Sequence, residues 1–300
     1  MPARLIAYLP DDAATSFLLR LQRSVRIGRG PDCDFRLDHP SISRQHASLS
    51  LEGAHWRLDD LGSKNGCFVD GVRTESAQLD RPVWVRLGDI HCEFAPLSED
   101  AAEHAERRMS VKRANSMVLA EGLAQKTSLP DLLAETVRAS VELADCERGF
   151  LLLADQGTYQ VVASHGLDSV SLRSHEFRGS VGAMQRALGT RVAIVINDAL
   201  ADPELASRAS VVAGGLRTLV CLPLLAGDEI IGLVYADSRR ADTVITTMDL
   251  DLLRAFAERA SLWIAARRGV LALSELMPRS PQAWNEILDA QQLVKTPASA

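Results

Sequence analysis

The sequence predicts two domains of different fold class: an N-terminal all-β sandwich, then an α+β domain with a central antiparallel sheet and flanking helices. Three observations lead to this prediction. The chain has 300 residues, more than one ordinary domain holds. As far as residue 97, many short runs, several of them alternating apolar and polar residues, are separated by Gly, Pro, Asp and Asn, which favours a β-sandwich. From residue 128 on, helical patterns enclose strand-like runs, which favours an α+β fold.

The first domain is expected over residues 1–97. Its strand-like runs are RLIAYLP, FLLRL, VRIGR, FRL, HASLSLE, HWRLDDL, CFVDG, VWVRLGD and HCEFAPL. Within CFVDG, Asp70-Gly71 predicts a tight hairpin turn, because glycine tolerates the positive φ that such turns require.

A connecting helix is expected over residues 98–127. The run SEDAAEHAERR is rich in Ala, Glu and Arg and contains no Gly or Pro. Apolar or small residues then recur at roughly helical spacing. These are Ala105, Met109, Ala114, Met117, Val118 and Leu123.

The second domain is expected over residues 128–268. Thr127 or Ser128 can cap a helix whose first turn contains Pro130. The strand-like runs that follow are RGFLLLAD, YQVVASHG, RVAIVIND, RTLVCLPLL and EIIGLVYADS, with a short helix at 180–188. The closing helix carries a stripe of apolar residues: Leu253, Phe256, Ala257, Ala260, Trp263 and Ile264. Residues 269–300 contain three prolines and are expected to form a short helix or two and a loose tail.

Composition limits the possible functions. The net charge of −6 argues against a general nucleic-acid binder. The five cysteines are scattered without a CxxC pair, which argues against a disulfide framework or a thiolate zinc site and fits a reducing cytoplasm. The N-terminus lacks a secretory pattern, and no apolar run is long enough to span a membrane. No P-loop, dinucleotide-binding or zincin motif occurs, so we expect no enzyme activity, no cofactor and no metal site.

Three polar segments of the first domain, IGRGPDCD, SISRQHA and LGSKNGCFVDG, each adjoin a strand, so each is expected on a loop at an end of the sandwich. Together they supply two guanidinium groups, an ammonium, a hydroxyl and an amide. The residues are Arg29, Ser43, Arg44, Lys64 and Asn65. Arginine offers a planar fork of donors and serine a short O–H bond, and both suit a dianionic phosphate.

These segments also contain GR, SxSRxH and GSKNG…VDG in that order, which resembles a forkhead-associated (FHA) domain. The resemblance covers roughly the first third of the chain. It implies a β-sandwich that binds phosphothreonine peptides through loops at one end. By position, Arg29 and Ser43 would contact the phosphate, Arg44 would add charge beside it, and Asn65 would hold the peptide backbone.

The resemblance also implies supporting roles. Gly28 and Gly66 would be structural, and His46 would brace its loop without touching the ligand. Lys64 departs from the family pattern, which usually has Thr or Ser at this position. A hydroxyl there often belongs to the phosphate site and to the small pocket for the threonine methyl. Lys64 would therefore act as a longer cation in place of that hydroxyl.

Each of these residues also has a purely structural interpretation. Arg29 could pair with Asp32 or Asp34 at a strand end. Ser43 could simply form a turn, and Asn65-Gly66 could simply be a tight turn. Their occurrence together and in the order of the family favours a phosphopeptide site.

The second domain resembles a GAF domain over residues 128–268, on the runs RTLVCLPLLAGDEIIG and GLVYADSRRAD and the helix after them. Some GAF domains bind cyclic nucleotides, tetrapyrroles or small metabolites, and others only dimerise. The sequence lacks the cyclic-nucleotide motif and an obvious chromophore-attachment cysteine, so the ligand, if the domain binds one, stays open.

These patterns together predict a cytoplasmic, non-enzymatic signalling adaptor of bacterial type. Its FHA domain would bind a phosphothreonine-bearing partner, a Ser/Thr kinase or its substrate, and its GAF domain would sense a small ligand or dimerise. The helices at 103–126 and 249–268 would carry a parallel homodimer. One alternative is a ligand-sensing GAF regulator whose FHA fold is a phosphate-independent scaffold, and another is an unrecognised enzyme in the second domain.

Overall fold

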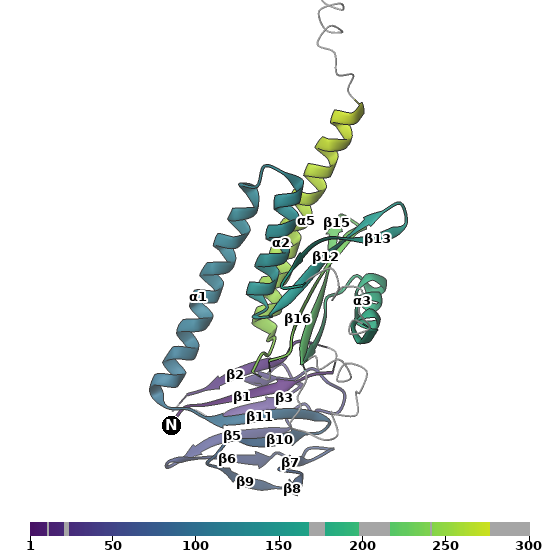
Figure 1. Ribbon diagram of the computed structural model, residues 1–300. Helices are drawn as coiled ribbons and strands as arrows, with labels where there is room; N and C mark the ends of the chain where they lie inside the picture. Colours follow the sequence, from purple (N-terminus) through teal and green to yellow (C-terminus); the bar gives the residue numbers. More distant parts are fainter. Residues whose placement is uncertain (11, 21–23, 168–177, 198–216, 241, 277–300) are drawn as a thin grey trace, which may run out of the picture.

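The computed structural model describes residues 1–10, 12–20, 24–167, 178–197, 217–240 and 242–276. It contains a β-sandwich and an α+β domain, with one long helix between them in the sequence (Figure 1). Both predicted fold classes are confirmed. The sandwich lies at one end of the molecule, and the long helices run away from it (Figure 1).

The sandwich consists of two sheets. One has the strand order β2-β1-β11-β10-β7-β8, and the other has the order β4-β3-β5-β6-β9. Neighbouring strands are antiparallel except for the short β3–β4 pair. The strands are β1 (Ala3–Tyr8), β2 (Thr15–Leu19), β3 (Val25–Gly28), β4 (Phe35–Arg36), β5 (Ala47–Glu52), β6 (His55–Asp60), β7 (Cys67–Val69), β8 (Val72–Thr74), β9 (Ser76–Leu79), β10 (Val83–Leu87) and β11 (Ile90–Pro96).

The two sheets enclose one apolar core. Alternation places Trp56 and Leu58 of β6 inside, whereas Arg57 between them faces water. Trp56 is fully buried, and its indole N–H donates to the carbonyl of Met1 at 2.9 Å. Burying a large apolar side chain of this kind contributes about 1.5–3 kcal/mol. The core therefore fixes the ends of the strands, from which the loops project.

The connecting helix, α1, spans Glu99–Ala124. The side chain of Ser98 caps its N-terminus by accepting a hydrogen bond from the N–H of Ala101 at 3.1 Å. The helix packs against α5 (Thr247–Leu276) and α2 (Leu129–Leu143).

The second domain has a five-stranded antiparallel sheet in the order β13-β12-β16-β15-β14. Helices α2 and α5 cover one face, and α3 lies on the other (Figure 1). Ser128, one of the two expected caps, caps α2. The remaining elements are β12 (Arg148–Asp155), β13 (Thr158–His165), α3 (Arg178–Thr190), β14 (Ile194–Asn197), β15 (Thr218–Ala226) and β16 (Glu229–Ser238).

Helix α5 differs from the expectation in length and in its exposed face. It continues beyond residue 268 to Leu276, and Gly269 lies within it at a negative φ instead of ending it. Ile264 of the predicted stripe is fully buried in the core of this domain, whereas Leu262 is 68% exposed. The expectation that Ile264 lies on a surface available to a second chain is therefore wrong.

The sandwich is docked on the second domain by its β1–β2 loop. The N–H of Ala14 donates to the carbonyl of Ile245 at 3.0 Å, and the N–H of Thr247 donates to the carbonyl of Ala14 at 2.9 Å. Ala13 is 1% exposed and belongs to the core of the second domain. Asn197, at the end of β14, binds both backbone groups of Ile245 at 2.9 Å. The segment before α5 thus joins the two domains.

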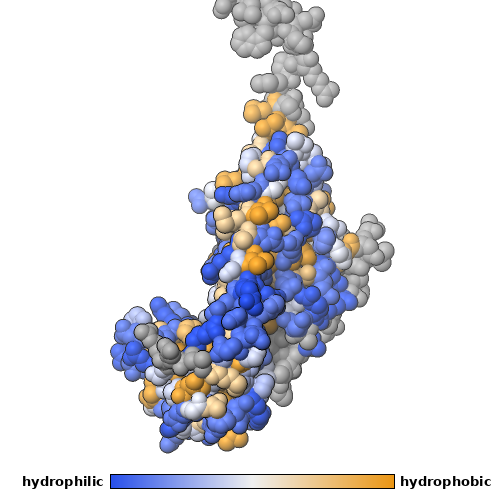
Figure 2. Space-filling model, turned by 90° about the vertical axis from the view of Figure 1, so that its left-hand side faces the viewer, coloured by the Kyte–Doolittle hydropathy of each residue, from blue (hydrophilic) through white to orange (hydrophobic). Residues whose placement is uncertain are grey.

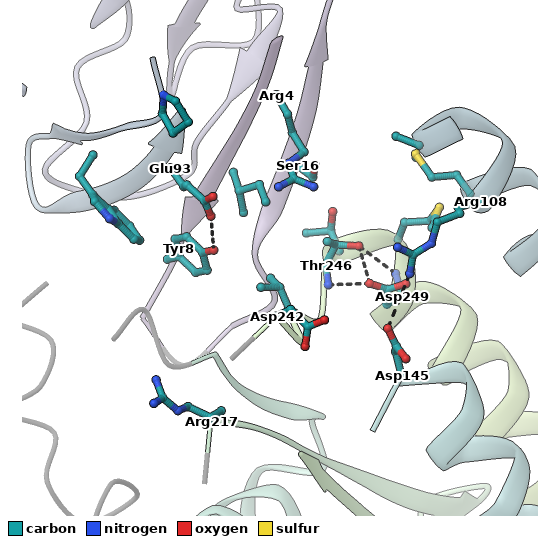
Figure 3. A pocket seen from close by; sticks show the side chains of 18 of the residues that line it. Arg4, Tyr8, Ser16, Glu93, Arg108, Asp145, Arg217, Asp242, Thr246 and Asp249 are labelled. Carbon is teal, nitrogen blue, oxygen red and sulfur yellow. Dashed lines mark hydrogen bonds and ion pairs between the residues drawn. The ribbon is translucent and has the colours of Figure 1, made fainter. Parts of the chain in front are cut away.

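A cleft of about 950 Å³ lies beside this junction, between the outer face of the six-stranded sheet and the helices (Figure 3). On the sandwich wall, the hydroxyl of Tyr8 donates to Glu93 at 3.2 Å. Burial, reinforced by the Glu93 carboxylate, raises the pKa of Tyr8, so this hydroxyl keeps its proton. On the helical wall, Lys112 lies 2.6 Å from Asp249.

Candidate functional site

The structure brings the three polar loops together at one end of the sandwich. The N–H of Arg29 donates to the carbonyl of Ser43, and the N–H of Gly30 donates to the carbonyl of Arg44, both at 3.0 Å. The N–H of Lys64 donates to the hydroxyl oxygen of Ser43, also at 3.0 Å. The loops between β3 and β4, β4 and β5, and β6 and β7 therefore form one connected surface.

Ser43 stands at the centre of this surface and is only partly exposed. Its hydroxyl oxygen already accepts the Lys64 N–H, so the hydroxyl proton can point outward and donate to an incoming anion. The side-chain amide nitrogen of Asn65 donates to the carbonyl of Ser41 at 2.7 Å. That bond fixes the amide and leaves the oxygen of Asn65 able to accept a hydrogen bond from a bound peptide.

His46 supports the loops from within and is fully buried. Its Nδ1 accepts the N–H of Ser43 at 3.0 Å, so the proton resides on Nε2, which donates to the carbonyl of Gly66 at 3.2 Å. Burial lowers the pKa of His46, and the ring is neutral at pH 7. The neutral ring connects the second loop to the third.

Two glycines permit the close approach of these loops. A Cβ on Gly28 would lie 2.4 Å from the carbonyl oxygen of Arg44, which is far inside contact distance. Gly66 has φ +82°, a conformation that other residues rarely adopt. Any side chain at Gly28, and any non-glycine residue at Gly66, would displace the loops that carry Ser43 and Asn65.

The cations of the site have no carboxylate partners in the described part of the chain. Arg29, Arg44 and Lys64 are exposed, and none forms an ion pair with a residue that the structure describes. The proposed pairing of Arg29 with Asp32 or Asp34 does not occur, and Asp34 instead accepts the backbone N–H of Arg26 at 2.9 Å. Other arginines of the sandwich do form ion pairs: Arg20, Arg36, Arg57 and Arg81.

Several residues that hold the loops of the site in place were not predicted from the sequence. The hydroxyl of Ser63 donates to Asp60 at 3.1 Å and accepts the N–H of Gly66 at 2.9 Å. The hydroxyl of Ser41 accepts the N–H of Asp89 at 3.0 Å. Serines within glycine-containing loops commonly form such bonds, so the supporting roles of Ser41 and Ser63 could have been predicted from the segments SISRQH and GSKNG.

The second domain contains a buried ion pair. Arg148 lies 2.7 Å from Asp237, which is fully buried, and burial raises the pKa of that carboxyl. Burial also raises the pKa of Cys146 and Cys221, so neither thiol is an activated nucleophile. The described helices include none that is long and apolar enough to cross a membrane.

Comparison with known proteins agrees with the two resemblances. The family model "FHA domain" matches residues 25–90, and the model "GAF domain" matches residues 128–264. The glycogen accumulation regulator GarA of Mycolicibacterium smegmatis is 35% identical over 105 residues, which are 34% of this chain and 66% of that protein. The oxoglutarate dehydrogenase inhibitor of Corynebacterium jeikeium is 31% identical over 99 residues, which are 33% of this chain and 68% of that protein.

A solved structure from a study of phosphothreonine-dependent FHA domain interactions is 30% identical and covers 33% of this chain and 99% of that chain, at a TM-score of 0.30. The comparison of this chain with GarA from Mycobacterium tuberculosis covers 56% of that protein. The chain therefore spans less than two thirds of the length of the first curated relatives. The chain belongs to the family of FHA-domain proteins and carries an FHA domain followed by a GAF domain.

Proposed function

We propose that the FHA domain binds a phosphothreonine-bearing protein through its loop end. The observation that carries this proposal is the Ser43 hydroxyl, free to donate, among three cations without carboxylate partners in the described part of the chain. Arg29 and Ser43 contact the phosphate, Arg44 adds positive charge, and Asn65 binds the peptide backbone. An arginine fork and a hydroxyl provide the short, charge-assisted hydrogen bonds that a dianionic phosphate accepts.

Lys64 takes the place of the hydroxyl that the family usually provides. Its backbone N–H orients Ser43, and its side chain is exposed. An ammonium on a flexible stem adds a point charge but forms no fixed pocket wall. We therefore expect peptide binding to depend strongly on the phosphate. We also expect the domain to discriminate less between phosphothreonine and phosphoserine than a domain with the usual hydroxyl.

The chain acts through binding and not through a reaction of its own. Its partner is a Ser/Thr kinase or a substrate of such a kinase. Two similar proteins are a glycogen accumulation regulator and an oxoglutarate dehydrogenase inhibitor, and both names describe regulators. The protonated thiols of the GAF domain, Cys221 buried and Cys146 half-buried, fit this assignment, because neither provides a nucleophile.

The test is a phosphothreonine peptide library applied to the full chain, with the unphosphorylated library as control. Selective retention of phosphorylated peptides supports phosphate-dependent binding. Equal retention of both libraries would favour the alternative, a phosphate-independent scaffold attached to a ligand-sensing GAF domain.

The connecting helix α1 and helix α5 of the GAF domain provide a homodimer interface. Apolar side chains stay exposed on both helices, and Figure 2 shows hydrophobic side chains among hydrophilic ones along the helical part. They are Met109, Val111, Met117 and Val118 of α1, and Leu262, Val270, Leu271 and Leu273 of α5. Exposed apolar stripes of this kind are covered when a second chain packs on them.

Light scattering tests the dimer directly. We expect the unmutated chain to be a dimer at tens of micromolar and Met117→Glu to be a monomer. Val72→Glu is the matched control. Val72 is 70% exposed, close to the 66% of Met117, but it lies on the sandwich. A monomeric unmutated chain would contradict the proposal.

The GAF domain also senses a small ligand on the α3 side of its sheet. That side has a separate apolar cluster, in which Phe150 and Tyr235 stack with ring centroids 4.8 Å apart. Thermal unfolding of the full chain in the presence of a metabolite panel tests this part: a ligand raises the melting temperature, and no response to any compound would favour a purely dimerising domain.

A further inference from the structure

A row of three side chains spans the neighbouring strands β8, β7 and β10 of the six-stranded sheet, next to the loop end. Arg73 of β8 is opposite Phe68 of β7, and Phe68 is opposite Arg86 of β10. Residues that are paired in register project from the same face of a sheet, with Cβ atoms about 4.5–5.5 Å apart. Their neighbours Cys67 and Leu87 are fully buried on the inner face. The row therefore occupies the outer face, and we call it the basic ledge.

Both guanidinium groups of the basic ledge lie at the loop end. Arg86 stacks on Phe68, with its Cζ 3.6 Å from the ring centroid, and donates to the carbonyl of Gly88 at 2.6 Å. A Cβ placed on Gly66 would lie 2.8 Å from Nε of Arg73, so that side chain covers Gly66. The N–H of Gly88 donates to the carbonyl of Gly66 at 3.1 Å. The two arginines thus flank the Gly66–Gly88 contact, directly after Asn65.

The basic ledge shares the electrostatic character of the loop site. Arg73 is exposed and forms no ion pair with any described residue, and Arg86 contacts a carbonyl and an aromatic ring. Arg81, near the far end of β10, differs because it pairs with Asp70 at 2.8 Å. None of the three ledge residues lines the cleft between the domains. Arg73 is therefore accessible to a ligand and carries an unneutralised charge, whereas Phe68 and Arg86 are half-buried.

We propose that the basic ledge is a second anion-binding surface, which recognises an acidic side chain of the same phosphopeptide that binds at Ser43. The inference rests on the proposed function and adds a sequence preference to it. A peptide in extended conformation advances about 3.3 Å per residue, so a chain leaving the loop site reaches the ledge within a few residues. Arg73 forms the ion pair with the peptide carboxylate. Phe68 holds Arg86 in place beside it and presents an apolar surface to the stem of the acidic side chain.

The test uses peptides with a fixed phosphothreonine, in which each flanking position in turn is Asp, Glu, phosphoserine or Ala. They are titrated into the full-length unmutated chain, Arg73→Gln and the control Arg81→Gln. We expect the unmutated chain to prefer an acidic residue over Ala at one flanking position by about two- to tenfold. Arg73→Gln loses this preference but keeps its affinity for the Ala peptide, and Arg81→Gln behaves as the unmutated chain. A preference for phosphoserine above Asp and Glu would identify a second phosphate as the anion.

A charge swap sharpens the test. Arg73→Glu should prefer Lys at the position where the unmutated chain prefers Asp, an effect that general destabilisation cannot produce. Phosphothreonine-dependent binding without any acidic preference, or an acidic preference that survives in Arg73→Gln, would overturn the ledge and leave the proposed function intact. Loss of phosphothreonine dependence in the unmutated chain would overturn the proposed function itself.

Discussion

Two concave regions of this molecule carry basic side chains, and the carboxylates around them differ. In the cleft between the domains, the ammonium of Lys112 lies 2.6 Å from the carboxylate of Asp249, which neutralises its charge. At the loop end of the sandwich, Arg29, Arg44 and Lys64 have no carboxylate partner among the described residues. The first arrangement holds helices together, whereas the second leaves an electrostatic field that an external anion can neutralise.

The difference separates charge that stabilises the fold from charge that is available to a ligand more clearly than exposure does. Arg57 is also exposed, but it pairs with Asp59 at 2.8 Å and contributes little to an external field. A cluster of unpaired cations raises the local concentration of anions and speeds their association. Substitutions in the two regions should therefore affect different quantities: the stability of the fold in one, and the affinity for a phosphopeptide in the other.

The largest effect on stability is expected from the substitution of His46, which supports the loops from within. His46→Ala leaves a cavity and removes the partners of the Ser43 N–H and the Gly66 carbonyl. We expect the free energy of unfolding to fall by about 3–5 kcal/mol and phosphopeptide binding to fail with it. Urea unfolding measures the loss. His55→Ala, at an exposed histidine of the same domain, is the control and should change stability by about 0.5 kcal/mol or less.

Protonation should weaken the same support. Burial lowers the pKa of His46 below its ordinary value of 6.5, so the unfolded chain binds this proton more readily than the folded one. The contribution of the neutral ring is present in full above pH 6.5 and is lost as the pH falls from there through the pKa of the folded state. Urea unfolding between pH 4 and 8, compared with His46→Gln, isolates this dependence. Equal slopes in both proteins would contradict it.

The next largest effect is expected from loss of the ion pair between Lys112 and Asp249 in the cleft. Asp249→Ala removes the partner of Lys112 and the acceptor of the Thr246 N–H, which donates at 2.8 Å at the start of α5. We expect a loss of about 2–4 kcal/mol, from a lost helix cap and a half-buried ammonium without a partner. Asp251→Ala on the exposed side of α5 is the control. The affinity of the FHA domain for phosphopeptide should stay unchanged, which separates this region from the loop end.

Substitution of the unpaired region should give the opposite pattern. Arg29→Ala and Ser43→Ala each remove a charge-assisted phosphate contact, worth about 1.5–3 kcal/mol or roughly ten- to a hundredfold in affinity. Because Arg29 is exposed and has no ion-pair partner among the described residues, the unfolding midpoint should hardly change. Arg36→Ala removes an exposed arginine that pairs with Asp38 and should leave affinity as it is. Unchanged affinity in well-folded Arg29→Ala would refute the assignment.

The smallest effect concerns Lys64. Its exposed ammonium acts as a point charge, which salt screens. Phosphopeptide affinity of the unmutated chain should therefore fall more steeply with salt than that of Lys64→Thr, a difference of about 1 kcal/mol or less. Lys64→Thr should also discriminate better against phosphoserine. Identical salt dependence and identical selectivity would show that Lys64 points away from the ligand.

The sequence predicted the three loops because their motifs are local. Each segment adjoins a strand whose alternation is readable, so the amino-acid pattern alone assigns the loops to ends of the sandwich. The pairing of Phe68 with Arg73 in the basic ledge could also be predicted from the sequence, since a tight turn at Asp70-Gly71 places the two residues opposite each other. The position of Arg86 beside Phe68 could not be predicted, because the β7–β10 pairing joins strands that are not consecutive in the chain.

The junction and the ends of α5 could not be predicted from periodicity. The bonds between Ala14 and the segment before α5 involve backbone groups, which every residue has. The core of the GAF domain covers Ile264 and leaves Leu262 exposed, and helical spacing alone does not decide which neighbour lies on which side. The expected closing helix ends at residue 268, but Leu, Ala and Glu after Gly269 favour the helix, and α5 continues to Leu276.

The most direct test of the unpaired cations is a calorimetric titration of the unmutated full chain. A phosphothreonine peptide selected from the library is compared with the same peptide carrying unmodified threonine. We expect saturable binding of the phosphorylated peptide, at least about a hundredfold weaker binding of its unmodified twin, and loss of the difference in the double variant Arg29→Ala/Ser43→Ala. Equal affinity for the two peptides in the unmutated chain would contradict the assignment of the loop end as a phosphate site.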